Sequence, residues 1–114
     1  MKKTTKKLDN SVIKALTIAC ETAKQWDSGF LWLTHSANYQ HFPASLRVTC
    51  VFGQESEIQE AYAQGMDNDL RRIIHSELLR IGVQVKDNNR LVRFDSEERC
   101  LMEDQGNWNR RLAR

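Results

Sequence analysis

Apolar residues recur every three or four positions near the start of the chain, which is the spacing of one face of an α-helix. The residues on this face are Leu8, Val12, Leu16, Ala19, Ala23 and Trp26. Any residue of 9–11 can cap the free backbone N–H groups at the helix start, and Gly29 can follow its end in a left-handed conformation. The pattern therefore predicts a helix from about residue 9 to residue 28.

Residues 46–52 alternate between two faces, which is the pattern of a half-buried β-strand. The residues on its apolar face are Leu46, Val48, Cys50 and Phe52. The preceding segment, residues 30–45, is rich in aromatic residues and is open to two interpretations. Residues 30–34 either form a short strand or belong to an aromatic loop, and Pro43 excludes a central strand at its own position.

Glycines separate two further helices. A weakly amphipathic helix is predicted over residues 55–64, and Gly65 ends it. Asp67 or Asn68 then caps a second helix that Gly82 closes. The apolar face of this second helix consists of Leu70, Ile73, Ile74, Leu78 and Ile81.

The last third of the chain predicts a hairpin and a short helix. Strands over residues 83–86 and 91–94 are expected to pair around residues 87–90, because asparagine tolerates positive φ in tight turns. Asp95 and Glu98 have the spacing of a capping box for a last helix through residue 104.

This order of elements predicts an α+β domain with a small, mainly antiparallel sheet of three or four strands and helices packed on it. A winged helix-turn-helix is the alternative, because its elements also run helix, strand, two helices and a hairpin wing. A chain of 114 residues has room for a single domain over residues 1–114. Its basic ends, at about 1–7 and 109–114, are expected to be flexible.

Charge is distributed unevenly along the chain. Seven of the 17 basic residues lie at the two ends, whereas all 15 acidic residues lie between residues 8 and 109. Within this acidic body, the helix and hairpin of residues 70–94 carry six basic side chains and two acidic ones. The six basic residues are Arg71, Arg72, Arg80, Lys86, Arg90 and Arg93. Since arginine and lysine contact phosphates, these residues, together with the basic ends of the chain, are the predicted nucleic-acid-binding site.

A protein–protein interface is the alternative function. Leu79 lies nearly opposite the apolar stripe of its helix, where it can meet a partner subunit. The aromatic residues Trp32, Tyr39 and Phe42 can join such an interface or close the core beneath a loop. The chain would then be an interaction module or a homodimeric adaptor without a role in nucleic-acid binding.

No spacing of residues predicts catalysis, a metal or a cofactor. The histidines and cysteines lack the paired spacing of zinc ligands, and no nucleotide-binding or nucleophile motif occurs. The three cysteines are an odd number at wide spacing, which favours free thiols. No apolar run is long enough to span a membrane, and no export signal is recognisable. We therefore expect a cytoplasmic, non-enzymatic binding or regulatory protein without a membrane partner.

The chain also resembles a group of known proteins. The segments that carry the resemblance are FLWLTHSANYQHFPASLRVTCVF, LRRIIHSELLRIGVQV, FDSEERC and GNWNRRL. They are similar to small gammaproteobacterial proteins, some of which are labelled as Fis-family transcriptional regulators. The resemblance covers most of the chain and implies a bacterial regulator, but it assigns no site residue.

Overall fold

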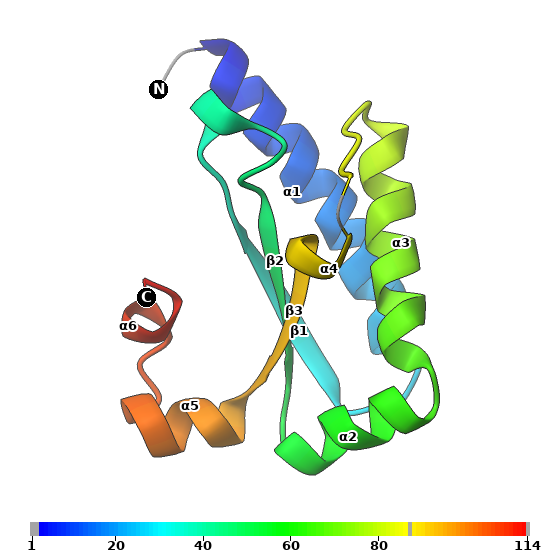
Figure 1. The fold of residues 1–114 in the computed structure, drawn as a ribbon, viewed down its shortest axis with the longest axis vertical. Helices are drawn as coiled ribbons and strands as arrows, with labels where there is room; N and C mark the ends of the chain where they lie inside the picture. Colours follow the sequence, from blue (N-terminus) through cyan, green and yellow to red (C-terminus); the bar gives the residue numbers. More distant parts are fainter. Residues whose placement is uncertain (1–2, 87, 114) are drawn as a thin grey trace.

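A computed structural model describes residues 3–86 and 88–113 of the chain. Its elements are α1 (Lys3–Lys24), β1 (Phe30–Ser36), the 3₁₀ turn η1 (Tyr39–His41), β2 (Arg47–Phe52), α2 (Glu55–Ala63), α3 (Met66–Arg80), α4 (Asn88–Leu91), β3 (Val92–Ser96), α5 (Glu97–Asp104) and α6 (Trp108–Leu112). Figure 1 shows α1 and α3 on one side of the sheet and α5 and α6 on the other. None of the helices within these ranges is long and apolar enough to cross a lipid bilayer.

The sheet is open and mixed, with strand order β1–β2–β3. β1 pairs antiparallel with β2, so that Leu33 lies opposite Cys50. β3 pairs parallel with the other edge of β2, so that Phe94 also lies opposite Cys50. The predicted α+β fold is thus confirmed, the sheet has three strands where three or four were expected, and residues 30–36 form one of them. The sheet is mixed rather than mainly antiparallel because the chain crosses over through α2 and α3 before β3 begins.

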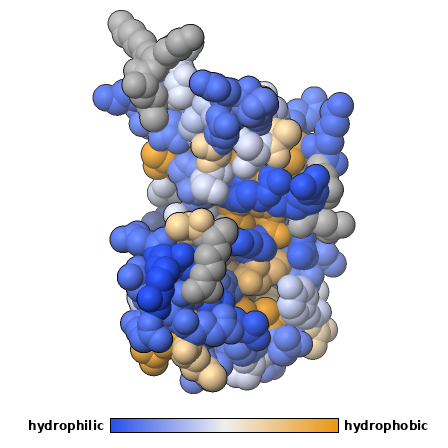
Figure 2. Space-filling view, turned by 60° about the vertical axis from the view of Figure 1, so that its left-hand side comes forward, coloured by the Kyte–Doolittle hydropathy of each residue, from blue (hydrophilic) through white to orange (hydrophobic). Residues whose placement is uncertain are grey.

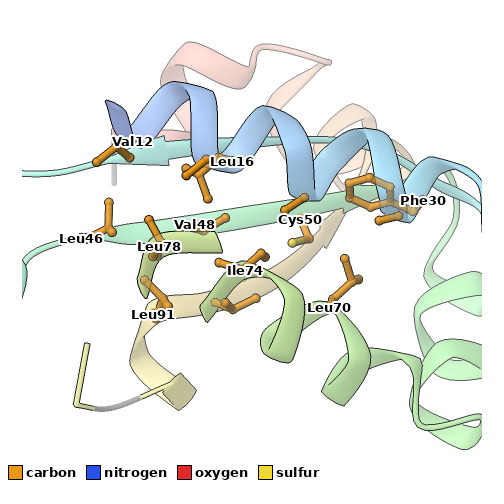
Figure 3. Close-up of a cluster of buried hydrophobic side chains, with 14 of the residues drawn as sticks. Val12, Leu16, Phe30, Leu46, Val48, Cys50, Leu70, Ile74, Leu78 and Leu91 are labelled. Carbon is orange, nitrogen blue, oxygen red and sulfur yellow. The ribbon is translucent and has the colours of Figure 1, made fainter. Parts of the chain in front are cut away.

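One hydrophobic core lies between the sheet and the helices α1 and α3. Figure 3 shows side chains of α1, β2 and α3 pointing toward one another in this core. The fully buried side chains include Leu16 of α1, Phe52 of β2 and Leu70 and Ile74 of α3. The apolar stripes predicted for the first helix, the central strand and the second firm helix therefore meet in one place.

The first helix is longer at its start than the sequence predicted. α1 begins at Lys3 rather than near residues 9–11, and it ends at Lys24. Ser11, one of the predicted caps, lies inside the helix, where its hydroxyl donates a hydrogen bond to the carbonyl oxygen of Lys7 at 3.1 Å. Such a bond to the preceding turn allows a serine to sit within a helix without interrupting it.

The predicted hairpin of strands 83–86 and 91–94 is wrong. Residues 83–86 form no strand, and the N–H of Val83 instead donates to the carbonyl of Leu78 at the end of α3. Residues 88–91 form α4, which leads directly into β3. Val92 of β3 lies opposite Val48 of the central strand, so this strand buries its apolar face without a hairpin partner. Residue 87 of the predicted turn lies outside the described residues. The winged helix-turn-helix alternative requires this hairpin as its wing, so the structure does not support it.

The residues that precede α3 and α5 as N-caps differ from the predicted ones. α3 begins after Gly65, which adopts a left-handed φ of 74°, so Asp67 lies in its first turn. α5 is capped by Ser96 rather than by Asp95, because the Ser96 Oγ accepts a hydrogen bond from the N–H of Arg99 at 3.0 Å. The helices predicted over residues 55–64 and up to residue 104 are confirmed as α2 and α5.

Candidate anion-binding site

Arg71, a predicted phosphate contact, is used inside the fold. Its Nη1 lies 2.7 Å from Asp67 Oδ2, and only 20% of its side chain is exposed. The guanidinium also lies 4.9 Å from the ring centre of Phe94 in β3. A cation stacked on an aromatic ring and paired with a carboxylate contributes to packing between α3 and β3.

Arg72 and Arg80 are exposed, but each lies close to a carboxylate of its own helix. The Nη1 of Arg72 is 3.4 Å from Asp69 Oδ1, and the Nη1 of Arg80 is 3.5 Å from Glu77 Oε1. A spacing of three residues places both partners on the same side of a helix. These carboxylates reduce the positive potential that would attract a phosphate to α3.

Lys86 and Arg90, the next predicted contacts, are brought together at a hollow of about 320 Å³. Its lining residues are Pro43, Ala44, Arg47, Gln84, Val85, Lys86 and Arg90. Three of these side chains are cationic, and none of the described lining residues is acidic. We call this feature the cationic hollow. It lies where the parallel strands β2 and β3 begin, because Arg47 opens β2 and Arg90 precedes β3 by two residues.

Arg47 is held at the hollow by two backbone carbonyl groups. Its Nη1 donates hydrogen bonds to the carbonyl oxygens of Ala44 and Leu46, each at 2.8 Å. An arginine has five N–H donors, and the two on Nη1 are used by these bonds. The three donors on Nε and Nη2 have no acceptor within the described residues. The side chain is half-buried, whereas Lys86 and Arg90 are exposed. The two carbonyl bonds therefore fix a guanidinium that still has donors to offer.

Arg93, the sixth predicted contact, lies on the sheet face opposite the core. Its Nε donates to the Thr49 hydroxyl at 2.9 Å, and Thr49 is two residues from Arg47 on the same face of β2. Arg93 lines a different hollow, which also contains Glu55 and Asp95. Figure 2 shows the side of the molecule that includes α5 and α6, where hydrophobic side chains are visible in a recess between hydrophilic ones. Arg93 is thus a neighbour of the cationic hollow but not part of its lining.

Of the four residues of the predicted protein interface, Tyr39 and Phe42 pack together, whereas Trp32 and Leu79 lie on other elements. Leu79 is exposed on α3, with 46% of its surface accessible. Trp32 instead contacts the C-terminal helices: its indole N–H donates to Glu97 Oε1 at 2.8 Å, and Trp108 donates to Oε2 of the same carboxylate at 3.0 Å. The two indole rings pack edge to face with their centres 4.9 Å apart. Trp32 therefore attaches α6 to the sheet.

The other two aromatic residues of this prediction pack together, and Tyr39 connects η1 to α1. The rings of Tyr39 and Phe42 lie 5.0 Å apart, and the Tyr39 hydroxyl donates to Asp9 Oδ1. The Nε2 of His35 lies 3.2 Å from the same oxygen. The hydrogen bonds from Tyr39 and His35 lower the pKa of Asp9, whereas burial and the Asp9 carboxylate raise the pKa of Tyr39.

The C-terminal segment, predicted to be a flexible basic end, is folded through α6. The Nε of Arg111 lies 2.6 Å from Asp95 Oδ2, and its Nη1 lies 3.0 Å from the buried Asp104. The hydrogen bond to Asp95 raises the pKa of Arg111. Arg110 also pairs with Asp104, at 3.2 Å. Both arginines are therefore paired with carboxylates of the fold, which offset their positive charge.

The three cysteines of the chain, Cys20, Cys50 and Cys100, are free thiols. Burial raises the pKa of Cys50 to about 12, which leaves the unreactive thiol form at neutral pH. Within residues 3–86 and 88–113, no three histidine, cysteine or acidic side chains are grouped so as to hold a metal ion.

Sequence reasoning found two of the three cations of the hollow and missed Arg47. In the sequence, Arg47 is only a polar position on an alternating strand. Its place beside Arg90 depends on the parallel pairing of β2 with β3, which no local pattern predicts. No protein-family model, curated protein or solved structure matches the chain. The resemblance to proteins labelled as Fis-family regulators therefore stays a prediction.

Proposed function

We propose that this chain is a small, non-enzymatic, cytoplasmic binding or regulatory protein that contacts nucleic acid through the cationic hollow. The observation that carries the proposal is the convergence of Arg47, Lys86 and Arg90 on one hollow whose described lining has no carboxylate. Cationic side chains bind nucleic-acid phosphates largely by charge.

The local charge of the hollow supports this choice over α3. Each arginine of α3 has a carboxylate within 3.5 Å on its own helix. At the hollow, Arg47 is held by two backbone carbonyls rather than by an acidic side chain. Among the described residues no carboxylate forms an ion pair with Arg47, and its fixed position lowers the entropy lost when a ligand binds.

Fluorescence anisotropy with labelled single-stranded and duplex oligonucleotides tests the proposal. Binding should weaken steeply as salt concentration rises, because each phosphate contact releases bound counterions. In the double variant Lys86→Gln/Arg90→Gln, the slope of log affinity against log salt should fall by roughly two.

The matched control is Arg72→Gln/Arg80→Gln, which removes two exposed arginines of α3. It should leave affinity within about twofold of the unmodified protein, because these cations are already neutralised locally. Absence of binding to either oligonucleotide, or an equal loss in both double variants, would contradict the proposal.

A homodimeric adaptor is the second candidate, and the edge strand β1 favours it. Among the described residues, β1 pairs with β2 alone, and its seven residues FLWLTHS include no Lys, Arg, Asp, Glu or Pro. Charged residues and proline are the usual protection of an open edge against pairing with another strand. Two copies of β1 can pair antiparallel about a two-fold axis, which forms a closed dimer.

Sedimentation velocity over a concentration series separates this candidate from the surface predicted around Leu79. Thr34→Lys places like charges close to one another in a paired β1 edge, whereas Leu79→Lys changes only α3. Loss of a dimer in the first variant alone would support β1 pairing. A monomer at all concentrations would exclude both interfaces.

A further inference from the structure

The shape of the cationic hollow restricts the kind of phosphate that can enter it. Its three cations line a recess of about 320 Å³ together with four uncharged residues. A phosphodiester within a nucleic-acid strand carries one charge and has a sugar on each side, so it binds along a surface. A phosphate monoester has one attachment, three free oxygens and about two negative charges at neutral pH. It can therefore enter a recess end-on.

We infer that the cationic hollow is a site for a terminal phosphate monoester. This inference rests on the proposed function and specifies the ligand of the same site. The monoester would come either from the end of an oligonucleotide or from a small phosphorylated molecule such as a nucleoside monophosphate. Both present the same dianionic group to Arg47, Lys86 and Arg90.

Arg47 supplies the geometric part of the recognition. Its Nη1 is fully used by the carbonyls of Ala44 and Leu46, which orients the guanidinium plane and leaves the donors on Nε and Nη2. These two nitrogens form a fork that matches two oxygens of one phosphate. A freely solvated arginine would have to be ordered by the ligand, whereas this one is already held.

The apolar part of the lining strengthens the binding of a doubly charged group. Pro43, Ala44 and Val85 line the hollow beside the cations. Apolar side chains beside a charged group lower the effective dielectric constant and strengthen attraction between opposite charges. Gln84, the one neutral polar side chain of the lining, can hydrogen-bond a hydroxyl or base of the attached molecule.

Isothermal titration calorimetry with two oligonucleotides of identical sequence tests the inference. One carries a 5′-phosphate and the other a 5′-hydroxyl, and both are titrated at the same salt concentration. We expect the phosphorylated strand to bind about tenfold more tightly or better, as expected for added charge-assisted hydrogen bonds. A nucleoside monophosphate, its nucleoside and inorganic phosphate form the second set of titrations.

Variants assign the preference to the hollow. Arg47→Gln should abolish the difference between the two strands, and Lys86→Gln, at an exposed position, should reduce it without risk to folding. Arg72→Gln is the matched control and should retain the full preference. Thermal unfolding of each variant separates loss of the site from loss of the fold.

Each outcome has a defined meaning. Equal affinity for the two strands overturns the inference but leaves the proposed function standing, whereas no binding of either strand, of the nucleoside monophosphate or of inorganic phosphate overturns both. Retention of the preference in Arg47→Gln and Lys86→Gln overturns its assignment to the hollow. If the monophosphate binds as tightly as the phosphorylated strand, the terminal phosphate site is supported with a small molecule as its ligand. If only the phosphorylated strand binds, the site is supported with a nucleic-acid end as its ligand.

Discussion

Arg47 derives its role from contacts that lie outside its own strand. Its two bonds to the carbonyls of Ala44 and Leu46 depend on the turn that brings residues 43–46 into β2. Its neighbours Lys86 and Arg90 are about forty residues away along the chain. Charge counting identified those two neighbours, because they lie in a segment with a basic excess. It could not identify Arg47, whose significance comes from the fold.

Asp67 and Asp69, in contrast, form ion pairs that the local sequence spacing itself predicts. They precede Arg71 and Arg72 by four and three residues, the spacings at which side chains meet on a helix. The basic appearance of residues 70–94 depended on starting the segment just after these carboxylates. The arginines of α3 could therefore have been recognised from the sequence as locally neutralised.

At the residue scale, we predict that Asp9 stabilises the fold in a pH-dependent way. Its folded-state pKa is lowered below the ordinary value of 3.8, so the unfolded chain takes up a proton more readily. The stabilisation is present above about pH 4 and is lost as the pH falls through the folded-state pKa. Asp9→Asn should lower the free energy of unfolding by about 1 kcal/mol at pH 7 and by less at pH 3, which lies below the ordinary pKa.

Urea unfolding of both proteins at the two pH values checks this prediction. Asp27→Asn is the matched control, because Asp27 is an exposed aspartate at a φ of 54°, a conformation that asparagine also tolerates. A destabilisation of Asp9→Asn that is equal at pH 7 and pH 3 would show that the carboxylate charge is not responsible.

At the element scale, periodicity located most helices and the central strand, since each depends on one face packed against the core. It failed at the hairpin because two features compete there. The N–H of Val83 closes the end of α3, and the apolar positions of residues 92–94 pair with the distant strand β2 rather than with residues 83–86. Parallel pairing across a long crossover leaves no local signature.

Ser96 gives a test of the revised boundary between β3 and α5. Its fully buried hydroxyl accepts the Arg99 N–H at 3.0 Å and donates to Glu55 Oε1 at 2.8 Å. Ser96→Ala should lower the free energy of unfolding by about 1–2 kcal/mol, because it removes a helix cap and leaves buried groups without partners. Thermal or urea unfolding measures the change. Ser56→Ala, at an exposed serine of α2, should change stability by less than about 0.5 kcal/mol, and an equal loss in both variants would contradict the cap.

At the scale of the whole molecule, the C-terminal helices α5 and α6 pack against one face of the sheet. The carboxylate of Glu97 accepts both the Trp32 and the Trp108 indole N–H groups, and Arg111 pairs with Asp95 of β3. Charge counting treated the C-terminal arginines as a free tail, because their acidic partners are spread over residues 95–104. Arg110 and Arg111 at the basic C-terminal end are therefore paired with carboxylates and do not form a free basic tail.

We predict that Glu97 holds α6 on the sheet. Glu97→Ala should reduce the free energy of unfolding by about 2 kcal/mol, since both indole donors lose a charged acceptor. It should also shift tryptophan fluorescence to longer wavelength as Trp108 and Trp32 become solvated. Glu21→Ala, at an exposed position of α1, should alter neither property. Unchanged fluorescence in Glu97→Ala would exclude this role.

The most direct test of the cationic hollow is a residue-resolved titration. Amide chemical shifts of ¹⁵N-labelled protein are followed by NMR while a 5′-phosphorylated oligonucleotide is added at moderate salt. We predict that the shifts concentrate on residues 44–47, 84–86 and 90, the two segments and the short helix that line the hollow. Shifts confined to residues 71–80 of α3 or to β1, or no shifts at a saturating concentration, would contradict the assignment of this site.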